Sequence, residues 1–220
     1  MSLVEDDRFH VPKGDPRLWL RPHLRPLDEA LEAVRPHKGD YDLNPRWRDV
    51  EAKPTLRPAA VLVPIIDRPA ALTVLLTRRS AHLSSHAGQV AFPGGRIDDT
   101  DDGPVGAALR EAEEEAGIPP HFVTPIGLLD PYETGSGFVI IPVVGVLREG
   151  CTPRANPGEV DEIFEVPLEF LMDVANHQAH TGVWQGRERR YYSMPYDRHN
   201  IWGATAGMLV NLRERLMASP

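Results

Sequence analysis

The chain has 220 residues, of which 41% are hydrophobic, so it is long enough to bury one good core. Its formal net charge of −8 at pH 7 disfavours long polyanions such as nucleic acids as partners. The single cysteine, Cys151, excludes an internal disulfide and a multi-thiolate zinc site, and we interpret it as a loop residue without a chemical role.

Residues 1–56 are rich in Pro and Arg, and we expect a partly helical N-terminal extension there. A short helix is predicted where four apolar residues share a face: Leu27, Ala30, Leu31 and Val34. Arg17, Arg21 and Arg25 are interpreted as plain surface residues. The extension is expected to wrap around the main domain, residues 57–220, or around a second subunit, which leaves a homodimer open.

The start of the chain gives no sign of export or membrane insertion. Its first seven residues include Glu5, Asp6 and Asp7 and lack the apolar core of a signal peptide. No apolar run approaches the ~20 residues that are needed to span a bilayer. We therefore expect a cytoplasmic protein without a membrane partner.

Two strands are predicted at the start of the main domain, at residues 59–66 and 71–77. Both runs are β-branched and aliphatic, and the turn signal at residues 67–70 separates them. They should lie in the sheet against which the next helix packs.

That helix has clear ends in the sequence. Asp102 or Gly103 can cap it, Pro104 suits its first position, and Gly117 suits the left-handed residue after its last turn. One narrow stripe is predicted to be buried: Val105, Ala108, Leu109, Ala112 and Ala116.

Three acids of this helix fall together on another side. Glu111, Glu114 and Glu115 are spaced i, i+3, i+4, whereas Glu113 points elsewhere. Three like charges on neighbouring turns repel one another unless a cation neutralises them. With a Gly-Gly turn upstream, the pattern indicates a site that holds a divalent metal ion against phosphate.

Further strands are predicted at residues 123–129, 139–147 and 162–166, with a glycine-containing loop at 132–138. A helix is predicted at 167–175, followed by a hairpin around residues 185–187. The last helix has a buried stripe of Ala204, Met208, Leu209, Leu212 and Leu216. Helices before, among and after strands predict an α/β fold with helices on both faces of a mixed sheet.

The segment from Gly94 to Ile118 resembles the signature of the Nudix hydrolases. That signature is a Gly, a short loop with an acidic residue, and then R-E-x-x-E-E-x-G with an aliphatic residue after it. The match consists of Arg110-Glu111, Glu114-Glu115, Gly117 and Ile118, with Asp101, or alternatively Asp102, as the loop acid. The resemblance implies an α/β/α sandwich with a mixed β-sheet and a pyrophosphatase.

Other segments resemble the coenzyme A pyrophosphatase branch of this family. They are Leu75-Leu76-Thr77-Arg78-Arg79-Ser80, residues 86–95 and residues 201–206, and the longer loop before Arg110 is also usual there. The branch commonly carries an Arg in the middle of the loop, where this chain has Ser84. The branch acts on coenzyme A or its thioesters and releases 3′,5′-ADP and 4′-phosphopantetheine or its acyl form.

Our hypothesis for the reaction starts from Mg²⁺ or Mn²⁺, which bridges the phosphates and lowers the pKa of a bound water. Glu111, Glu114 and Glu115 would hold the ions, helped by a backbone carbonyl of Gly94 or Gly95. Arg110 would orient Glu111, and Asp101 would balance Arg110 from the loop.

The general base is either a Glu of the helix or an acid of the later loop, Glu159 or Glu162. Arg78 and Arg79 are candidates for the phosphate of the adenosine half, with Gly95 beside them. Tyr132 and Phe138 are candidates for stacking on the base.

Two alternatives differ in class. A different nucleoside diphosphate derivative, such as a nucleotide sugar or a dinucleotide, could be the substrate. A nucleotide sensor without turnover would be expected to have a damaged acidic cluster, and this cluster is complete.

Overall fold

The computed structural model describes residues 9–31, 38–45, 56–83, 86–184 and 186–218. Nine strands of these residues form one mixed sheet, and its centre is made of β2 (Arg57–Asp67), β8 (Phe138–Leu147) and β3 (Leu72–Arg79). β2 pairs with β8 in parallel and with β3 in antiparallel orientation. The two strands predicted at 59–66 and 71–77 are therefore confirmed as sheet neighbours.

Six further strands extend this sheet. They are β1 (Lys38–Gly39), β4 (Val90–Ala91), β5 (Gly94–Arg96), β6 (Val123–Leu128), β7 (Tyr132–Glu133) and β9 (Val160–Pro167). The order is β1-β7-β8-β2-β3-β4, with β5 on β2, β6 on β8 and β9 on β3. The predicted strands at 123–129, 139–147 and 162–166 are confirmed. The loop predicted at 132–138 instead begins with β7, which pairs with β8 and β1.

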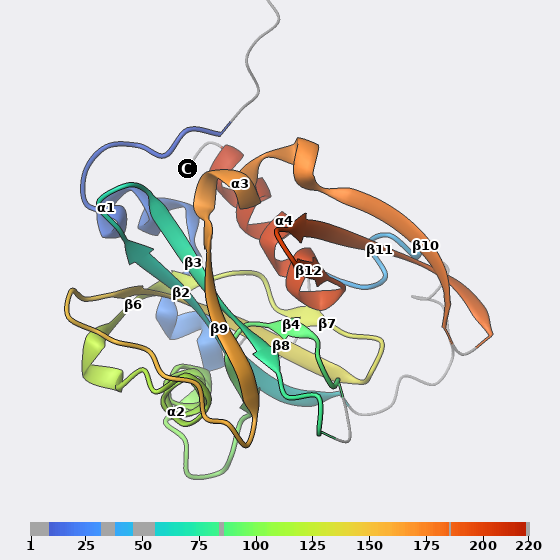
Figure 1. Cartoon of the computed structure of the whole chain (residues 1–220), viewed down its shortest axis with the longest axis horizontal. Coiled ribbons are helices and arrows are strands. Elements are labelled where there is room, and N and C mark those ends of the chain that lie inside the picture. Colours follow the sequence, from blue (N-terminus) through green and yellow to red (C-terminus); the bar gives the residue numbers. More distant parts are fainter. Residues whose placement is uncertain (1–8, 32–37, 46–55, 84–85, 185, 219–220) are drawn as a thin grey trace, which may run out of the picture.

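Both faces of the sheet are buried. Because side chains alternate along a strand, Ala60 and Leu62 of β2 pack towards α2 (Gly103–Ala116), whereas Val61 and Val63 pack towards α4 (Ala204–Met217). Figure 1 shows α2 on one side of the sheet and α4 with α3 (Leu168–Met172) on the other. This layering confirms the α/β fold with helices on both faces of a mixed sheet.

A smaller sheet leads into the last helix. Its strands are β10 (Gln178–Trp184), β11 (Arg187–Tyr196) and β12 (His199–Trp202), and β11 pairs with both neighbours in antiparallel orientation. β10 and β11 confirm the hairpin that is predicted around residues 185–187. Four of the five residues in the predicted stripe of α4 are buried: Met208, Leu209, Leu212 and Leu216. The fifth, Ala204, is half-buried.

Two helical predictions are only partly confirmed. The helix predicted at 167–175 ends at Met172, and the 3-10 turn η5 (Val174–Asn176) follows it. The helix predicted from Leu27 is the 3-10 helix η2 (Leu27–Leu31), and Val34 lies outside the described residues. The α-helix α1 (Pro16–Leu20), five residues that begin with Pro, was not predicted. Nor were the 3-10 helices η1 (Arg21–His23), which follows α1, and η4 (Pro120–Phe122).

The described part of the extension packs on the main domain. Leu20 is fully buried in the core that contains α4, and the backbones of Arg25 and Leu128 exchange two hydrogen bonds of 2.9 Å. Arg25 is more than a surface residue, because its side chain is 19% exposed and forms an ion pair with Glu29. No described helix is long and apolar enough to cross a membrane.

Candidate active site

Helix α2 presents its acids at three different depths. Its bounds agree with the predicted signals, because Pro104 lies in its first turn and Gly117 ends it with a φ of 59°. The Glu115 side chain is 3% exposed, that of Glu111 is 16% exposed and that of Glu114 is 53% exposed. The three carboxylates therefore form a graded acidic edge on α2, residues Glu111, Glu114 and Glu115, that runs from the core to the solvent.

The buried side of α2 differs in detail from the predicted stripe. Ala108, Ala112 and Ala116 are buried as predicted. Val105 and Leu109 are only half-buried, and Ala107 is fully buried instead. The helix therefore faces the sheet with alanines, which lets its backbone, and with it Glu115, come close to β5.

The two glycines of β5 make this close approach sterically feasible. A Cβ atom on Gly95 would lie 2.3 Å from Glu111 Oε1, and one on Gly94 would lie 2.5 Å from the carbonyl oxygen of Ala60 on β2. The Gly94 N–H also donates a hydrogen bond to Glu115 Oε2 at 3.2 Å. The Gly-Gly pair thus fits between β2 and the acidic edge, where any side chain would clash.

Arg110 connects the loop acid to the acidic edge. Its guanidinium donates to both carboxylate oxygens of Asp101 at 2.9 and 3.0 Å, and to Glu111 at 3.0 Å and Glu114 at 3.1 Å. Asp101 is 4% exposed, and the hydrogen bonds from Arg110 hold its pKa below the usual range. Asp102 is exposed and makes no capping bond with its side chain, so Asp101 is the acid that meets Arg110.

Burial changes the acidity of the two inner carboxylates. It raises the pKa of Glu115 to about 7, although the nearby Arg79 and the Gly94 N–H lower it in part. Burial likewise raises the pKa of Glu111, against the opposing effect of Arg110. The carboxylate of Glu159 raises both pKa values further, so negative charge is in excess around the two arginines.

Hard carboxylate oxygens with excess negative charge are a suitable donor set for Mg²⁺ or Mn²⁺. Among the residues that the structure describes, no three His, Cys, Asp or Glu side chains are grouped closely enough to hold a metal ion. Arg110 lies between Glu111 and Glu114, and Arg79 Nη1 donates to Glu115 Oε1 at 3.0 Å. The donors fit the ion in kind and charge, but side chains would have to move to bind it.

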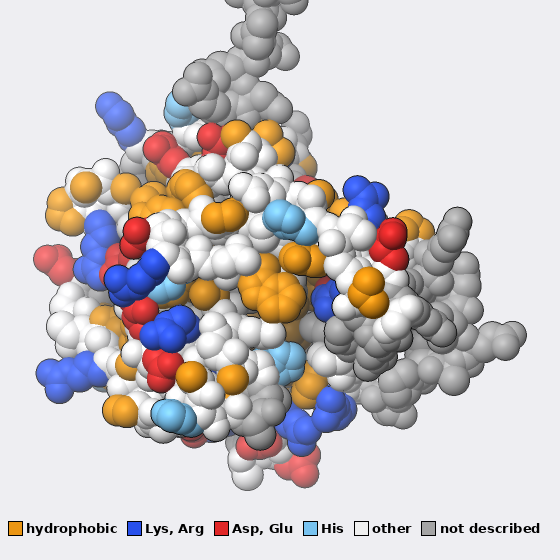
Figure 2. Space-filling model, turned by 45° about the vertical axis from the view of Figure 1, so that its right-hand side comes forward, with side chains coloured by type: hydrophobic (Ala, Val, Ile, Leu, Met, Phe, Trp, Pro, Cys, Tyr) orange, Lys and Arg blue, Asp and Glu red, His pale blue; other side chains and the backbone are white. Residues whose placement is uncertain are grey.

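Arg78 and Arg79 face different partners. Arg78 contacts Asp161 at 3.2 Å and Glu162 at 3.4 Å, on β9, while Arg79 reaches the acidic edge. Figure 2 shows acidic and basic side chains interleaved along one side of the molecule. Of the two predicted phosphate ligands, the structure brings only Arg79 to the acidic edge.

The two candidate bases of the later loop are also separated. Glu162 forms ion pairs with Arg198 and Arg78 and lies 3.5 Å from His199 Nε2. Glu159 is close enough to affect the pKa of Glu111 and Glu115, and its carbonyl accepts a hydrogen bond from the Ser80 N–H at 2.8 Å. Of the two, only Glu159 acts on the pKa values of the acidic edge.

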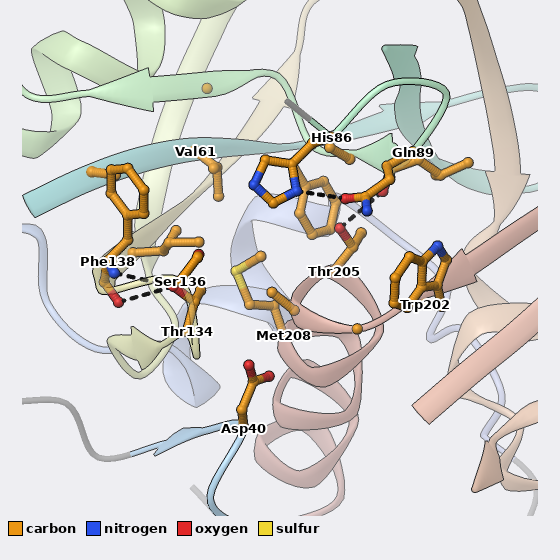
Figure 3. A pocket seen from close by; sticks show the side chains of 18 of the residues that line it. Asp40, Val61, His86, Gln89, Thr134, Ser136, Phe138, Trp202, Thr205 and Met208 are labelled. Atoms are coloured by element: carbon orange, nitrogen blue, oxygen red, sulfur yellow. Dashed lines mark hydrogen bonds between the residues drawn. The ribbon is translucent and has the colours of Figure 1, made fainter. Parts of the chain in front are cut away.

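A cavity of about 590 Å³ adjoins the Gly-Gly pair on the side of α4. Gly94, Gly95 and Arg79 are among its lining residues, so the cavity and the acidic edge share this wall. Figure 3 shows Phe138 at one end, Trp202 at the opposite end, and Met208 of α4 between them. Arg96 lies at the Phe138 end, because its Cζ atom is 5.8 Å from the centroid of the Phe138 ring, and Tyr191 lies beside Trp202, with ring centroids 5.6 Å apart.

A segment of the N-terminal extension contributes to the cavity wall through Asp40. The Asp40 carboxylate accepts hydrogen bonds from Tyr132 Oη at 3.0 Å, from the Gly135 N–H at 2.8 Å and from Arg189 Nη2 at 2.7 Å. Tyr132 is buried, 5% exposed, and does not line this cavity. Of the two aromatic residues predicted to stack on a base, the cavity therefore contains only Phe138.

The loop before β4 contributes two hydrogen-bonded residues. His86 has a φ of 56°, and its Nδ1 lies 2.9 Å from Gln89 Oε1 (Figure 3). A positive φ is uncommon for a residue with a side chain. Ser84, in the same loop, lies outside the described residues.

Several cavity residues were not predicted from the sequence. Asp40, Arg189 and Met208 come from segments far apart in the chain, and no local pattern marks them. Trp202 and Thr205 do carry a sequence signal, because residues 201–206 resemble a segment of the coenzyme A pyrophosphatase branch. That resemblance does not assign a function to either residue. Cys151 is a free, half-buried thiol whose pKa is raised by burial.

Known proteins resemble this chain in sequence and in fold. A model of the NUDIX domain matches residues 55–185. The chain is 43% identical over 164 residues to the "Uncharacterized Nudix hydrolase NudL" of Escherichia coli, which covers 74% of this chain and 85% of that protein. The same values hold for the protein of that name in Shigella flexneri.

The fold is also similar to a crystal structure of a Nudix hydrolase from M. smegmatis, RenU. The TM-score is 0.51 at 24% sequence identity, and the match covers 74% of this chain and 88% of that one. The range matched by the family model contains α2 and the Gly-Gly pair but ends before β11, β12 and α4. Part of the cavity wall therefore lies beyond the matched range.

Proposed function

The chain belongs to the Nudix hydrolase family and is a pyrophosphatase, and from this premise we propose that its substrate is coenzyme A or a coenzyme A thioester. The reaction would use Mg²⁺ or Mn²⁺ and would release 3′,5′-ADP and 4′-phosphopantetheine or its acyl form. Cleavage of the pyrophosphate bond by water is slow without help, because the anionic oxygens repel the nucleophile and the leaving phosphate needs its charge stabilised.

One observation carries the proposal: the large cavity and the acidic edge share the wall formed by Gly94, Gly95 and Arg79. A ligand in the cavity can therefore place its pyrophosphate against this wall while its two halves extend towards the Phe138 and Trp202 ends. The volume of about 590 Å³ is within the usual range for small-molecule sites.

The acidic edge would hold the metal ions. Nudix hydrolases generally require divalent metal ions. Glu111, Glu114 and Glu115 are the proposed ligands, with a backbone carbonyl of Gly94 or Gly95. When bound, the ions neutralise the two phosphates and lower the pKa of a coordinated water.

Arg110 acts as a positioning residue in this proposal. It holds Glu111 and Glu114 from one guanidinium, which is itself fixed by two hydrogen bonds to the buried Asp101. Glu111 is thereby oriented before metal arrives, and the metal charge would replace part of the charge that Arg110 now supplies. Asp101 keeps Arg110 in place while these contacts exchange.

We propose Glu159 as the group that takes the proton of the attacking water. It lies close enough to Glu111 and Glu115 to change their pKa values, and its backbone is tied to the end of β3 by the Ser80 N–H. Glu162 is a poorer candidate, because Arg78 and Arg198 already neutralise it. A Glu of the acidic edge remains the alternative base.

On the substrate side, Arg79 and Gly95 are the proposed contacts to the pyrophosphate. Arg79 can donate to a phosphate oxygen with the guanidinium nitrogens that do not face Glu115. Arg78 is not retained in this role, because its guanidinium contacts Asp161 and Glu162 on β9.

Another nucleoside diphosphate derivative is the alternative substrate within the same reaction class. A panel of coenzyme A, acetyl-coenzyme A, ADP-ribose, a nucleotide sugar and a dinucleoside polyphosphate, each with Mg²⁺ and with Mn²⁺, decides between them by product analysis. We expect the highest kcat/KM for coenzyme A or its thioester, with 3′,5′-ADP as a product. A higher kcat/KM for any other member of the panel would contradict the proposal.

A further inference from the structure

Two guanidinium groups lie close to the ring of Phe138, which forms one end of the cavity; Arg96 also lines the cavity, whereas Arg57 does not. The Cζ atom of Arg57 lies 4.0 Å from the centroid of the Phe138 ring, and that of Arg96 lies 5.8 Å from it. The sheet register fixes this cluster, because Arg57 is the partner of Phe138 across β2 and β8, and Arg96 is the partner of Ala59 across β5 and β2. Arg57, Arg96 and Phe138 form what we call the arginine cluster.

The two arginines of the cluster are exposed, and within the described residues neither has a carboxylate partner. The Arg57 guanidinium donates to the carbonyl oxygen of Ser136 at 3.2 Å, which leaves its charge uncompensated. Arginines nearby differ, because Arg79 and Arg110 both bind carboxylates. The cluster therefore offers two positive charges and most of their N–H donors to a ligand.

The arginine cluster is next to the reaction site without being part of it. Arg96 directly follows Gly95, which contacts Glu111, and the Arg96 carbonyl accepts a hydrogen bond from Arg110 Nη2 at 3.1 Å. Arg96 and Phe138 both line the cavity (Figure 3 shows Phe138 there). When a pyrophosphate is bound at the Gly-Gly pair, the arginine cluster would thus still be available to bind another anionic group of the same ligand.

The opposite end of the cavity has a different chemistry. Trp202 and Tyr191 lie together at this end and are both aromatic, and the apolar Met208 lies between them and Phe138 (Figure 3 labels Trp202, Met208 and Phe138). Tyr191 and Trp202 pack edge to face, with ring centroids 5.6 Å apart. Three of the described arginines line the cavity. Arg79 pairs with Glu115 and Arg189 with Asp40, whereas Arg96 has no carboxylate partner among the described residues. The half of a ligand with additional negative charge therefore belongs at the arginine cluster.

We propose that Arg57 and Arg96, supported by Phe138, form a subsite for a phosphomonoester on the nucleoside half of the substrate. A guanidinium presents paired N–H donors that match two phosphate oxygens, and two of them can neutralise a dianion. The subsite would select nucleoside diphosphates that carry a second phosphate over those that lack one. This inference rests on the proposed function for the identity of the ligand.

Binding of the nucleotide product tests the subsite directly. Titration calorimetry should show that the wild-type protein binds 3′,5′-ADP at least about tenfold more tightly than 5′-AMP, because charged hydrogen bonds are each worth a factor of this order. In Arg57→Gln and Arg96→Gln the preference should fall to threefold or less, with 5′-AMP affinity unchanged. Arg148→Gln, an exposed arginine on another loop, is the matched control.

Turnover gives a second, independent readout. The ratio of kcat/KM for coenzyme A to that for 3′-dephospho-coenzyme A should fall about tenfold in Arg96→Gln, and Arg96→Lys should recover part of it. The melting temperature should stay within a degree or two, because both arginines are exposed.

The failure of the subsite and that of the proposed function give different results. If coenzyme A is hydrolysed but both ratios are unchanged in the arginine variants, the subsite is wrong and the function stands. If coenzyme A is not hydrolysed but the preference for 3′,5′-ADP over 5′-AMP depends on Arg57 and Arg96, the subsite stands and the substrate is wrong. Equal loss of affinity for both nucleotides would overturn the subsite as well.

Discussion

The acidic edge of α2 and the cavity beside α4 meet at Gly94 and Gly95, yet they are built in different ways. The acidic edge comes from one stretch of chain between residues 94 and 118, and a regular helix fixes its spacing. The cavity draws on Asp40 near one end of the chain and on Trp202 and Met208 near the other. The proposed catalytic residues thus come from one short stretch of sequence. The shape of the cavity depends instead on how segments that are distant in the chain pack together.

The largest expected effect comes from the inner end of the acidic edge. Glu115→Gln should lower turnover about a thousandfold or more, because metal charge contributes several kcal/mol to the transition state. The fold should survive, since burial already favours an uncharged group at this position. Glu113→Gln, an exposed acid on the same helix, is the matched control and should retain full activity. Steady-state rates and thermal melting of both variants check this prediction.

The Gly-Gly pair should separate activity from stability. In Gly95→Ala the new Cβ would displace the flexible carboxylate of Glu111, and a misplaced catalytic group can cost about a hundredfold in rate. In Gly94→Ala the Cβ would meet the backbone of β2, so the melting temperature should fall instead. Activity assays and calorimetry on the two variants measure this contrast. If both substitutions lowered the melting temperature equally, the account that Gly95→Ala acts mainly by displacing the Glu111 carboxylate would be wrong.

A smaller effect is expected at the Trp202 end of the cavity. Trp202→Ala should raise KM about tenfold with kcat nearly unchanged, because an aromatic wall contributes roughly 1.5 kcal/mol to binding and does not touch the phosphates. Trp202→Phe should restore most of the affinity. Initial-rate kinetics over a range of substrate concentrations separate the two constants. A loss confined to kcat would place Trp202 in the reaction and not in binding.

The smallest expected effect is a pH dependence of metal binding. Burial raises the pKa of Glu115 from 4.5 to about 7, so the metal-free protein protonates this group below pH 7, and binding then releases a proton. Affinity should fall about threefold between pH 7.5 and pH 6.5. For the same reason the metal-free protein loses the stability contributed by protonated Glu115 as the pH rises from 4.5 through 7. Titration calorimetry in buffers of different ionisation enthalpy counts the protons, and Glu115→Gln should abolish the release.

Elements with strong local signals could be predicted from the sequence. The ends of α2 were predicted from Pro104 and Gly117, and β2 from a run of apolar residues that is buried on both faces. Helical spacing predicts that the acids at 111, 114 and 115 share one side of α2, and Arg110 contacts the first two of them there. Their role as metal ligands stays a prediction. Helix α1 was not predicted, since five residues are too few to show a period.

Features that depend on long-range packing could not be predicted in this way. The ion pair between Asp40 and Arg189 joins positions 149 residues apart. Tyr132 is predicted as a candidate for stacking on a base, but the fold buries it beside Asp40. Arg78 and Arg79 are both predicted as phosphate ligands, although neighbouring residues of a strand point to opposite faces. That period-two signal was present in the sequence.

The central claim is that the acidic edge of α2 holds the metal ions that drive hydrolysis, and Mn²⁺ binding tests it most directly. The measurement is a titration of the wild-type protein, Glu115→Gln and Glu113→Gln with Mn²⁺, followed by the electron paramagnetic resonance of the free ion. The account predicts equal dissociation constants for the wild type and Glu113→Gln and one at least about tenfold higher for Glu115→Gln. Binding of Mn²⁺ to Glu115→Gln as tight as to the wild type would contradict it.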